Sequence, residues 1–287
     1  MSERIFIVGA GVVGFASGQA LLHLGHRVTF VDTRDERCAE LRAAGFDSST
    51  SIALDDDRCI IALSVPTPSV DAAYDLSYLR SAVRAAAEAI RARGGDHIVV
   101  VRSTVAPQTC DDFVLPMLRA QLEGSTATAH VASVPEFLRQ ATALDDALHP
   151  TMTVIGAHEA DVRSRLKAVF GALGGAVCIF ENTASAELVK IAHNCFNAAK
   201  ISFFNELYVV AAGLGLDGDD VANVIVRSAE ASTNIYYGTK GGYPFGGACL
   251  PKDLDGLIDF AENRGLATPL LRAVREVYDS LVKLQQL

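Results

Sequence analysis

Short β-branched runs alternate with amphipathic segments through the first half of the chain. The runs predict seven strands: Ile5–Val8, Val28–Asp32, Ile60–Leu63, Ile98–Val101, His130–Ala132, Thr153–Ile155 and Val177–Phe180. Helical patterns lie between most of them, and strands that alternate with helices form parallel sheets, because each connection has to cross back over the sheet. We therefore expect residues 1–182 to form an α/β domain with a doubly wound parallel sheet.

The pattern changes after about Asn182. From Ser185 to about Ala212, apolar residues recur at helical spacing without Pro or Gly, which predicts one long helix of about 28 residues. Further helices are predicted at Asp219–Ser228, Leu254–Asn263 and Pro269–Gln286, with a glycine-rich loop at Gly238–Gly247. Residues 183–287 are therefore expected to form a mainly helical domain around a long central helix.

Composition narrows the class of protein. Half of the 287 residues are hydrophobic and 21% are charged, which is typical of a folded globular protein. The net charge is -9 and no basic run is present, which argues against nucleic acid as a partner. No apolar stretch approaches the ~20 residues that cross a bilayer, so we expect a cytoplasmic protein without membrane contact. The six cysteines show no metal-ligand spacing, so no metal is expected.

A glycine motif follows the first predicted strand. Gly9, Gly11 and Gly14 form a GxGxxG pattern that opens a predicted helix, and Asp32 ends the next strand. This context is typical of a Rossmann-like dinucleotide site, in which the acid binds the adenosine ribose. An acid there repels a 2′-phosphate and favours NAD over NADP, although Arg34 keeps NADP open. The residues expected to bind the cofactor here are Gly9, Gly11, Val12, Val13, Gly14, Asp32 and Arg34.

A second motif, Gly246-Gly247-Ala248-Cys249-Leu250-Pro251-Lys252-Asp253, places a cysteine just before a predicted helix. A helix N-terminus and the nearby Lys252 both favour the thiolate, which is the nucleophilic form. Asp253 offers a base or an orienting group. Local sequence alone favours a reactive and a structural Cys249 equally.

Several motifs together resemble those of one enzyme family. The cysteine loop is similar to the GGxCxxKD signature of the UDP-glucose/GDP-mannose dehydrogenase family, the nucleotide-sugar 6-dehydrogenases. The other matching segments, in chain order, are Val65-Pro66-Thr67-Pro68 with Asp75-Leu76, Ser103-Thr104-Val105-Ala106-Pro107, Pro135-Glu136-Phe137-Leu138-Arg139, Ala186-Glu187-Leu188-Val189-Lys190 with Asn194, and Asn205-Glu206. The resemblance covers essentially the full chain.

The resemblance implies NAD-dependent oxidation of a primary alcohol to a carboxylate. Cys249 would capture the aldehyde as a thiohemiacetal that is oxidised to a thioester, Lys190 and Asn194 would stabilise the oxyanion, and Glu136, Thr104 and Asp253 would serve hydrolysis. It adds as cofactor contacts Val65, Pro66, Thr67, Ser103, Thr104 and Lys252. It implies as substrate contacts Phe137, Leu138, Lys190, Asn194, Lys240, Tyr243, Phe245 and Gly246.

The sequence departs from the family pattern at four places. Gln140 stands where a second acid is usual, Met152 where an Arg is typical, and Thr233 where an Arg reaches a neighbouring subunit's substrate. An amide cannot act as a general base, so Gln140 shifts hydrolysis onto the remaining acids. The family's C-terminal nucleotide-binding domain is also missing from these 287 residues. Either a longer protein has been shortened, or a natural variant holds its substrate differently.

Other readings stay open at this point. Without the resemblance, Lys190 and Asn194 could form an exposed polar stripe and Glu136 could be a solvated loop acid. A two-electron β-hydroxyacid-type dehydrogenase and a non-catalytic dinucleotide-binding protein are the competing functions. Apolar residues on the long helix, namely Phe196, Ile201, Phe203, Phe204 and Tyr208, exceed what one small domain is expected to cover and predict a homodimer. The family resemblance implies the same pairing.

Overall fold

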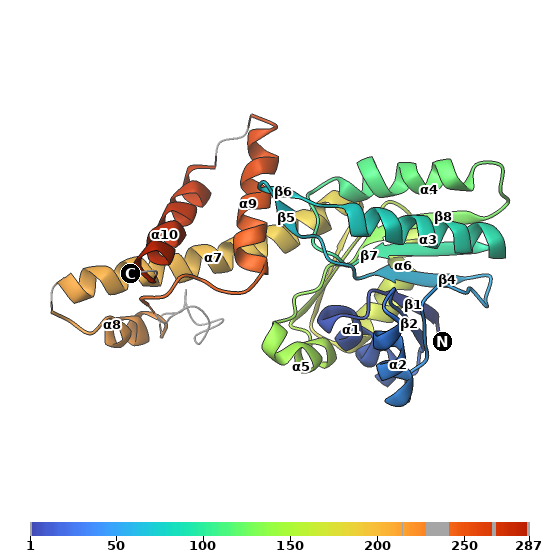
Figure 1. Cartoon of the computed structure of the whole chain (residues 1–287), viewed down its shortest axis with the longest axis horizontal. Helices are drawn as coiled ribbons and strands as arrows, with labels where there is room; N and C mark the ends of the chain where they lie inside the picture. Colours follow the sequence, from blue (N-terminus) through green and yellow to red (C-terminus); the bar gives the residue numbers. More distant parts are fainter. Residues whose placement is uncertain (1, 214, 228–240, 266–267, 286–287) are drawn as a thin grey trace. The chain divides into compact units, whose positions relative to one another are not determined.

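The computed structural model describes residues 2–213, 215–227, 241–265 and 268–285 (Figure 1). The chain forms two units, one of residues 1–68 and 75–190 and one of residues 69–74 and 191–287. The boundary expected from the sequence, between residues 182 and 183, is where the long helix α7 (Thr183–Gly213) begins, whereas the first unit continues along that helix to Lys190.

The first unit is an eight-stranded sheet covered by helices on both faces. Its strands, in spatial order, are β10 (Ala176–Phe180), β9 (Met152–Ala157), β8 (Thr128–Ser133), β7 (Asp96–Val101), β4 (Cys59–Leu63), β1 (Arg4–Val8), β2 (Arg27–Val31) and β3 (Ser48–Ser49). Its helices are α1 (Val12–His23), α2 (Asp35–Ala43), α3 (Ser77–Arg93), η1 (Cys110–Val114), α4 (Leu115–Leu122), η2 (Gln140–Thr142), α5 (Ala143–Leu148), α6 (Ala160–Phe170) and η3 (Gly171–Leu173).

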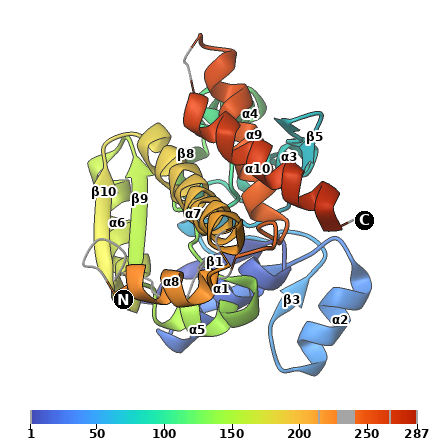
Figure 2. The ribbon, with the colours of Figure 1, turned by 90° about the vertical axis from the view of Figure 1, so that its left-hand side faces the viewer.

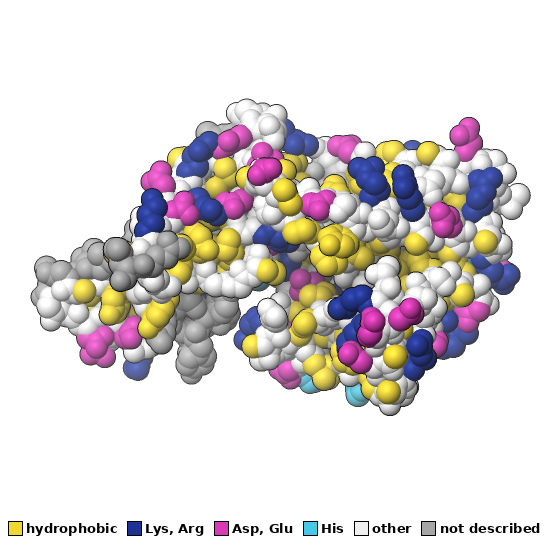
Figure 3. Space-filling model, viewed as in Figure 1, with side chains coloured by type: hydrophobic (Ala, Val, Ile, Leu, Met, Phe, Trp, Pro, Cys, Tyr) yellow, Lys and Arg dark blue, Asp and Glu magenta, His cyan; other side chains and the backbone are white. Residues whose placement is uncertain are grey.

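Strands β1 and β4 are buried along their full lengths, as central strands of a sheet with two covered faces must be. Alternate side chains of β1 divide between the two cores: Phe6 packs on the side of α3 and α4, and Ile5 on the side of α1 and α6. Helices α3 and α4 lie side by side (Figures 1 and 2). Helix α3 buries its apolar stripe and exposes arginines, which appear dark blue over α3 in Figure 3.

All seven predicted strands are present, and the α/β class is confirmed. The sheet is parallel except between β8 and β9, which pair antiparallel through Ala132 with Ala157 and Ser133 with Gly156. The segment after β8 contains α5, which packs against α1, and it returns the chain to the sheet at the end where β8 stops. Strands β9 and β10 are parallel to each other and run opposite to the rest.

The regular structure in the described residues of the second unit is helical apart from one hairpin. It consists of the greater part of α7, α8 (Gly218–Ile225), α9 (Cys249–Glu262), α10 (Pro269–Gln285) and the antiparallel pair β5 (Ser69–Val70) and β6 (Ala73–Tyr74). Its core contains Ile191 and Ala198 from α7, Leu254 from α9 and Val274 from α10. Asp217 caps α8 by accepting the backbone N–H groups of Asp219 and Asp220.

Two predicted helices need adjusted bounds, and the predicted end of a third, Gln286, lies outside the described residues. Helix α9 begins at Cys249, five residues before the predicted start at Leu254, because Pro251 falls in the first turn, where its missing N–H removes no helical bond. Helix α8 ends at Ile225, and the predicted end at Ser228 lies outside the described residues. Helix α10 ends at Gln285 in the described part of the chain. Of the predicted loop at Gly238–Gly247, residues 241–247 are described and are not helical or extended.

Candidate active site

The loop between β1 and α1 depends on two glycines for its shape. Gly9 has φ of +94°, and a Cβ on it would lie 2.5 Å from the Ser64 carbonyl oxygen after β4. A Cβ on Gly14 would overlap the carbonyl oxygen of Gly9. Glycine at both positions therefore allows the loop, the first turn of α1 and the end of β4 to pack against one another.

Gly11 differs from its neighbours in having open space. A Cβ placed there would meet no atom within 4 Å, and the residue is exposed at the N-cap of α1. The N–H groups of the first helical turn have no intrahelical acceptors, and the positive end of the helix dipole favours an anion. The cradle that this loop leaves beside α1 fits the diphosphate of a dinucleotide.

Asp32 follows β2 beside that cradle. Its Oδ2 accepts a hydrogen bond from the Ala10 N–H at 3.1 Å, and its Oδ1 accepts from the Arg34 N–H at 3.1 Å and from Arg34 Nε at 3.0 Å. Burial opposes ionisation, but these donors outweigh it and hold the pKa of Asp32 below its ordinary value. Asp32 is therefore an anion suited to ribose hydroxyls, while the largely exposed Arg34 side chain partly offsets its charge.

The loops after β4 and β7 are joined by two hydrogen bonds. The Ser103 hydroxyl donates to the Val65 carbonyl at 2.6 Å, and the Thr67 hydroxyl donates to the Thr104 carbonyl at 2.6 Å. Pro66, between them, is exposed. The predicted cofactor contacts in the first unit thus follow the carboxyl ends of β1, β2, β4 and β7, where open α/β sheets bind their ligands.

Glu136 and Lys190 form a buried ion pair in the first unit. Glu136 Oε1 lies 3.4 Å from Lys190 Nζ, and Oε2 accepts the Leu138 N–H at 2.6 Å. The Phe137 ring lies beneath the ammonium, 5.4 Å from Nζ. Only 8% of Glu136 and 4% of Lys190 are exposed, which contradicts a solvated loop acid and an exposed polar stripe. Thr104 is buried as well.

In the second unit, Asp253 is the centre of a cluster of hydrogen bonds. The carboxylate is 0% exposed, accepts from Asn194 Nδ2 and lies 3.1 Å from Lys252 Nζ. Lys252, expected to bind the cofactor, thus pairs with Asp253. Cys249 is exposed at the first residue of α9, one helical turn before Asp253. An exposed thiol therefore lies at the start of α9, one turn before a buried carboxylate that contacts an amide and an ammonium.

The loop before α9 carries the remaining predicted substrate contacts. Tyr243 is exposed, and its N–H donates to Asn205 Oδ1 at 3.1 Å, which ties the loop to α7. Gly246 is exposed and open, whereas the Phe245 ring is buried and packs on Tyr278. Lys240 and Thr233 lie outside the described residues.

Three polar residues of these units escaped the sequence-based assignment. Tyr74 donates to Asp253 from the β5–β6 hairpin, and no feature of the segment between Pro68 and Asp75 signals this contact. Glu187 accepts two backbone N–H groups near η1, although its motif gave no hint of that role. Arg102, directly after β7, is buried, and its guanidinium donates to the Ser17 hydroxyl.

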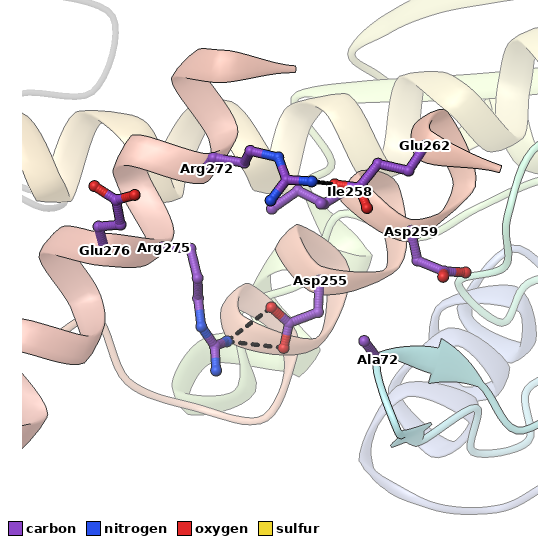
Figure 4. Close-up of a pocket in the computed structure, with 8 residues that line it drawn as sticks. All are labelled: Ala72, Asp255, Ile258, Asp259, Glu262, Arg272, Arg275 and Glu276. Carbon is purple, nitrogen blue, oxygen red and sulfur yellow. Dashed lines mark hydrogen bonds and ion pairs between the residues drawn. The ribbon is translucent and has the colours of Figure 1, made fainter. Parts of the chain in front are cut away.

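A groove of about 240 Å³ lies between α9 and α10 (Figure 4). Arg275 points to Asp255 from α10, and its Nη1 lies 2.8 Å from each of the two carboxylate oxygens. Arg272 pairs with Glu262. The 100° step of a helix turns Asp255 away from Cys249 and Asp253. Acidic and basic side chains of α9 and α10 both line the groove, and Cys249 is not among its lining residues.

Two general features of the described residues bear on ligands. Among them, no group of three or more His, Cys, Asp or Glu residues is arranged to hold a metal ion. None of the helices in this part of the chain has the length and apolar character that a membrane span requires.

Comparison with known proteins identifies the family. Residues 45–173 match the NAD binding domain of the UDP-glucose/GDP-mannose dehydrogenase family, and residues 184–280 match its central domain. The GDP-mannose 6-dehydrogenase of Azotobacter vinelandii is 30% identical over 98% of this chain and 71% of its own length. The chain belongs to the UDP-glucose/GDP-mannose dehydrogenase family.

Further members give the same picture. The GDP-mannose 6-dehydrogenase of Pseudomonas aeruginosa is 31% identical, and the UDP-glucose 6-dehydrogenase of Rickettsia prowazekii 30%. This chain spans 66% and 65% of their respective lengths, although they cover 93% and 94% of it. A UDP-glucose dehydrogenase structure from Pyrobaculum islandicum superimposes with a TM-score of 0.89 at 33% identity, covering 98% of this chain and 68% of that one.

Membership of the UDP-glucose/GDP-mannose dehydrogenase family confirms the predicted Rossmann-like and helical architecture and NAD as the cofactor. It agrees with the open cradle at Gly11 and the anionic Asp32.

Proposed function

We propose that this chain carries the NAD-dependent oxidation of a nucleotide sugar's primary alcohol to a carboxylate, with Cys249 as the covalent nucleophile. One observation carries the proposal: an exposed thiol begins α9, one turn before a fully buried carboxylate held by Asn194 and Lys252. A cysteine at a helix N-terminus beside a lysine is favoured as the thiolate. The relatives' names point to a nucleoside diphosphate hexose as the substrate class.

The proposed reaction oxidises the same carbon twice. The loop of Gly9, Gly11 and Gly14, together with Asp32, would hold NAD, and one NAD would supply the hydride acceptor for each oxidation. The first oxidation would also release the alcohol proton to solvent. Between the two oxidations, Cys249 Sγ attacks the aldehyde and forms a C–S bond, giving a thiohemiacetal. Loss of the second hydride and of the hydroxyl proton leaves a thioester. Water then attacks the carbonyl, the C–S bond breaks, and Cys249 departs as the thiolate while the carboxylate is released.

Polar side chains on α7 would stabilise the oxygen at the reacting carbon. Lys190 and Asn194 are four residues apart and share a helix face, so a cation and an amide donor act on the same side of α7. Preorganised donors of this kind stabilise developing negative charge more strongly in a buried site than in water.

Hydrolysis would be assisted by Glu136 as the base for water, together with Thr104 and Asp253. Glu136 is ion-paired with Lys190, and its second oxygen is held by the Leu138 N–H, so its orientation is set by two contacts. Gln140, in place of the usual second acid, is exposed and can contribute no proton transfer.

The decisive measurement is the number of NADH molecules released per carboxylate formed. Purified protein is incubated with NAD and a panel of UDP- and GDP-hexoses, alongside Cys249→Ala. The control is Cys178→Ala, which removes the other exposed cysteine, on the edge strand β10. We expect two NADH per carboxylate, lost in Cys249→Ala and kept in the control. One NADH per product with an unaffected Cys249→Ala would instead support the two-electron alternative.

We also infer that the protein acts as a homodimer in the cytosol. The exposed aromatic residues of α7, Phe196 and Phe203, give a surface for a second copy. All six cysteines are thiols rather than halves of disulfides, as the reducing cytosol maintains.

A further inference from the structure

The carboxylate of Asp253 has a third partner in addition to Asn194 and Lys252. The Tyr74 hydroxyl lies 3.1 Å from Oδ1, the oxygen that also faces Lys252 Nζ at 3.1 Å, while Asn194 Nδ2 donates to Oδ2. An ionised carboxylate offers about four acceptor positions, so three donors occupy most of them. Asp253 is therefore built to accept hydrogen bonds and to fix the direction of its donors.

Tyr74 reaches Asp253 from a distant part of the sequence. It ends the short hairpin of β5 and β6, whose turn residues Asp71 and Ala72 have φ of 50° and 66°. Non-glycine residues adopt such angles at a cost in conformational energy. The hairpin belongs to the second unit, as Asp253 does.

The Tyr74 ring is held on two sides. A Cβ on Gly256, one turn after Lys252 on α9, would overlap the ring, so only glycine lets the aromatic side chain pack there. The Lys252 ammonium lies over the ring, 5.2 Å from its centre. These contacts leave the phenol oxygen directed at Asp253.

Burial and the negative groups around the phenol favour its protonated form. Burial is the main cause that raises the pKa of Tyr74, and the negative charge of Asp253 and the ionised forms of Cys195 and Cys249 raise it further. The facing groups are thus Asp253, the two thiols and the Lys252 ammonium. The phenol keeps its proton and remains a hydrogen-bond donor.

We propose that Tyr74 is a positioning residue of the Cys249 site, whose hydroxyl fixes Asp253 and thereby the placement of Asn194 and Lys252 beside the thiol. The catalytic meaning of this inference rests on the proposed function, whereas the contacts of Asp253 with Tyr74, Asn194 and Lys252 do not depend on it. Loss of the hydroxyl leaves the negative charge of Asp253 less compensated. A thiolate at Cys249 is then less favoured, because like charges repel.

The test is the pH dependence of iodoacetamide alkylation, followed by mass spectrometry at each cysteine, in the full chain and in Tyr74→Phe. Phenylalanine keeps the ring against Gly256 and Lys252 and removes only the hydroxyl. We expect the Cys249 profile to move to higher pH, with a rate at neutral pH lower by roughly threefold to tenfold, the range for a fraction of one pKa unit to a full unit. Cys178 provides a reference in the same sample, and Tyr78→Phe, on the exposed surface of α3, is the matched control.

Unchanged Cys249 profiles in a folded Tyr74→Phe protein would overturn the proposal. Should that variant fail to fold, 3-fluorotyrosine at position 74 keeps the hydroxyl and makes it a stronger donor. The Cys249 profile should then move to lower pH, and the absence of any movement would count against the inference. Alkylation needs neither NAD nor a sugar. A shifted profile in a protein that oxidises no nucleotide sugar would therefore refute the proposed function and leave the positioning role standing.

Discussion

Glu187 is a buried acid on α7 that holds a strained backbone segment. Its two carboxylate oxygens accept the N–H groups of Gln108 at 2.7 Å and Cys110 at 2.8 Å, and only 2% of the residue is exposed. Gln108 has φ of 76°, an angle that a non-glycine residue adopts only where its surroundings enforce it. Burial raises the pKa of Glu187 from 4.5 to about 7, although the hydrogen bonds from Cys110 and Gln108 oppose this.

The raised pKa of Glu187 makes stability depend on pH. The folded protein retains this proton up to about pH 7, whereas the unfolded chain loses it near pH 4.5, so the free energy of unfolding falls as the pH rises between these values. The pKa difference corresponds to about 3 kcal/mol. We expect Glu187→Gln, which cannot titrate, to gain stability relative to the wild type over this interval, by up to that amount.

Urea unfolding of both proteins from pH 4 to pH 8 measures the difference directly. Glu181→Gln, an exposed acid just before α7, is the control and should follow the wild type at every pH. Parallel curves for Glu187→Gln and the wild type would show that Glu187 titrates normally.

Individual side chains also mark how far the sequence could lead. Sequence motifs predicted Cys249, Lys190 and Asn194 as site residues, because reacting groups need fixed residue types at fixed spacing. Only some partners of Asp253 could be predicted from sequence. Lys252 and Asn194 lie in motifs, but Tyr74 is 179 residues away in sequence and belongs to no recognisable motif. The burial of Glu136 and Lys190 could not be predicted from sequence either, since it depends on which residues pack over them.

The turn from β1 into α1 offers a matched pair of substitutions. We expect Gly14→Ala to lower both stability and NAD affinity, because its Cβ would overlap the Gly9 carbonyl and force α1 away from β1. Overpacking of this kind costs about 1–3 kcal/mol or more. Gly11→Ala should retain stability within about 1 kcal/mol, the usual scale for an N-cap substitution, and still lose NAD affinity, since its Cβ fills the open cradle.

Thermal unfolding and calorimetric titration with NAD measure the two effects separately. A Gly11→Ala protein that binds NAD as tightly as the wild type would mean that the diphosphate does not approach this residue. Gly25→Ala is unsuitable as a control because Gly25 has φ of +82°, so the wild type is the reference for both variants.

Longer elements were more predictable than short ones. The central strands β1 and β4 were predictable as apolar runs because both of their faces are covered. Helix α7 was predictable from its unbroken helical period. The two-residue strands β5 and β6 are too short to show any period. The antiparallel pairing of β8 and β9 depends on the path of the connection between them, which periodicity does not encode.

Helix α7 exposes a pair of aromatic residues that suits self-association. Phe196 and Phe203 are seven residues apart, on one stripe, and are 66% and 55% exposed. We expect the double variant Phe196→Ser, Phe203→Ser to weaken a homodimer at least about 100-fold, since buried aromatic anchors dominate such interfaces. Light scattering over a range of micromolar concentrations reports the mass, and Tyr78→Ser, on α3, should leave it unchanged. A wild-type protein that is already monomeric there would refute the dimer.

The hairpin that carries Tyr74 has a consequence for how this protein is made. Its partner Asp253 leaves the ribosome 179 residues later, which at about 5–20 residues per second is a delay of roughly 10–35 s. During that interval the first unit can complete its sheet while the β5–β6 strand pair waits for the helices of its own unit to be synthesised. The segment after Pro68 must therefore stay soluble, without its final partners, while the nascent chain grows. A fragment beginning at Ile191 would lack Tyr74, one of the side chains that contact Asp253.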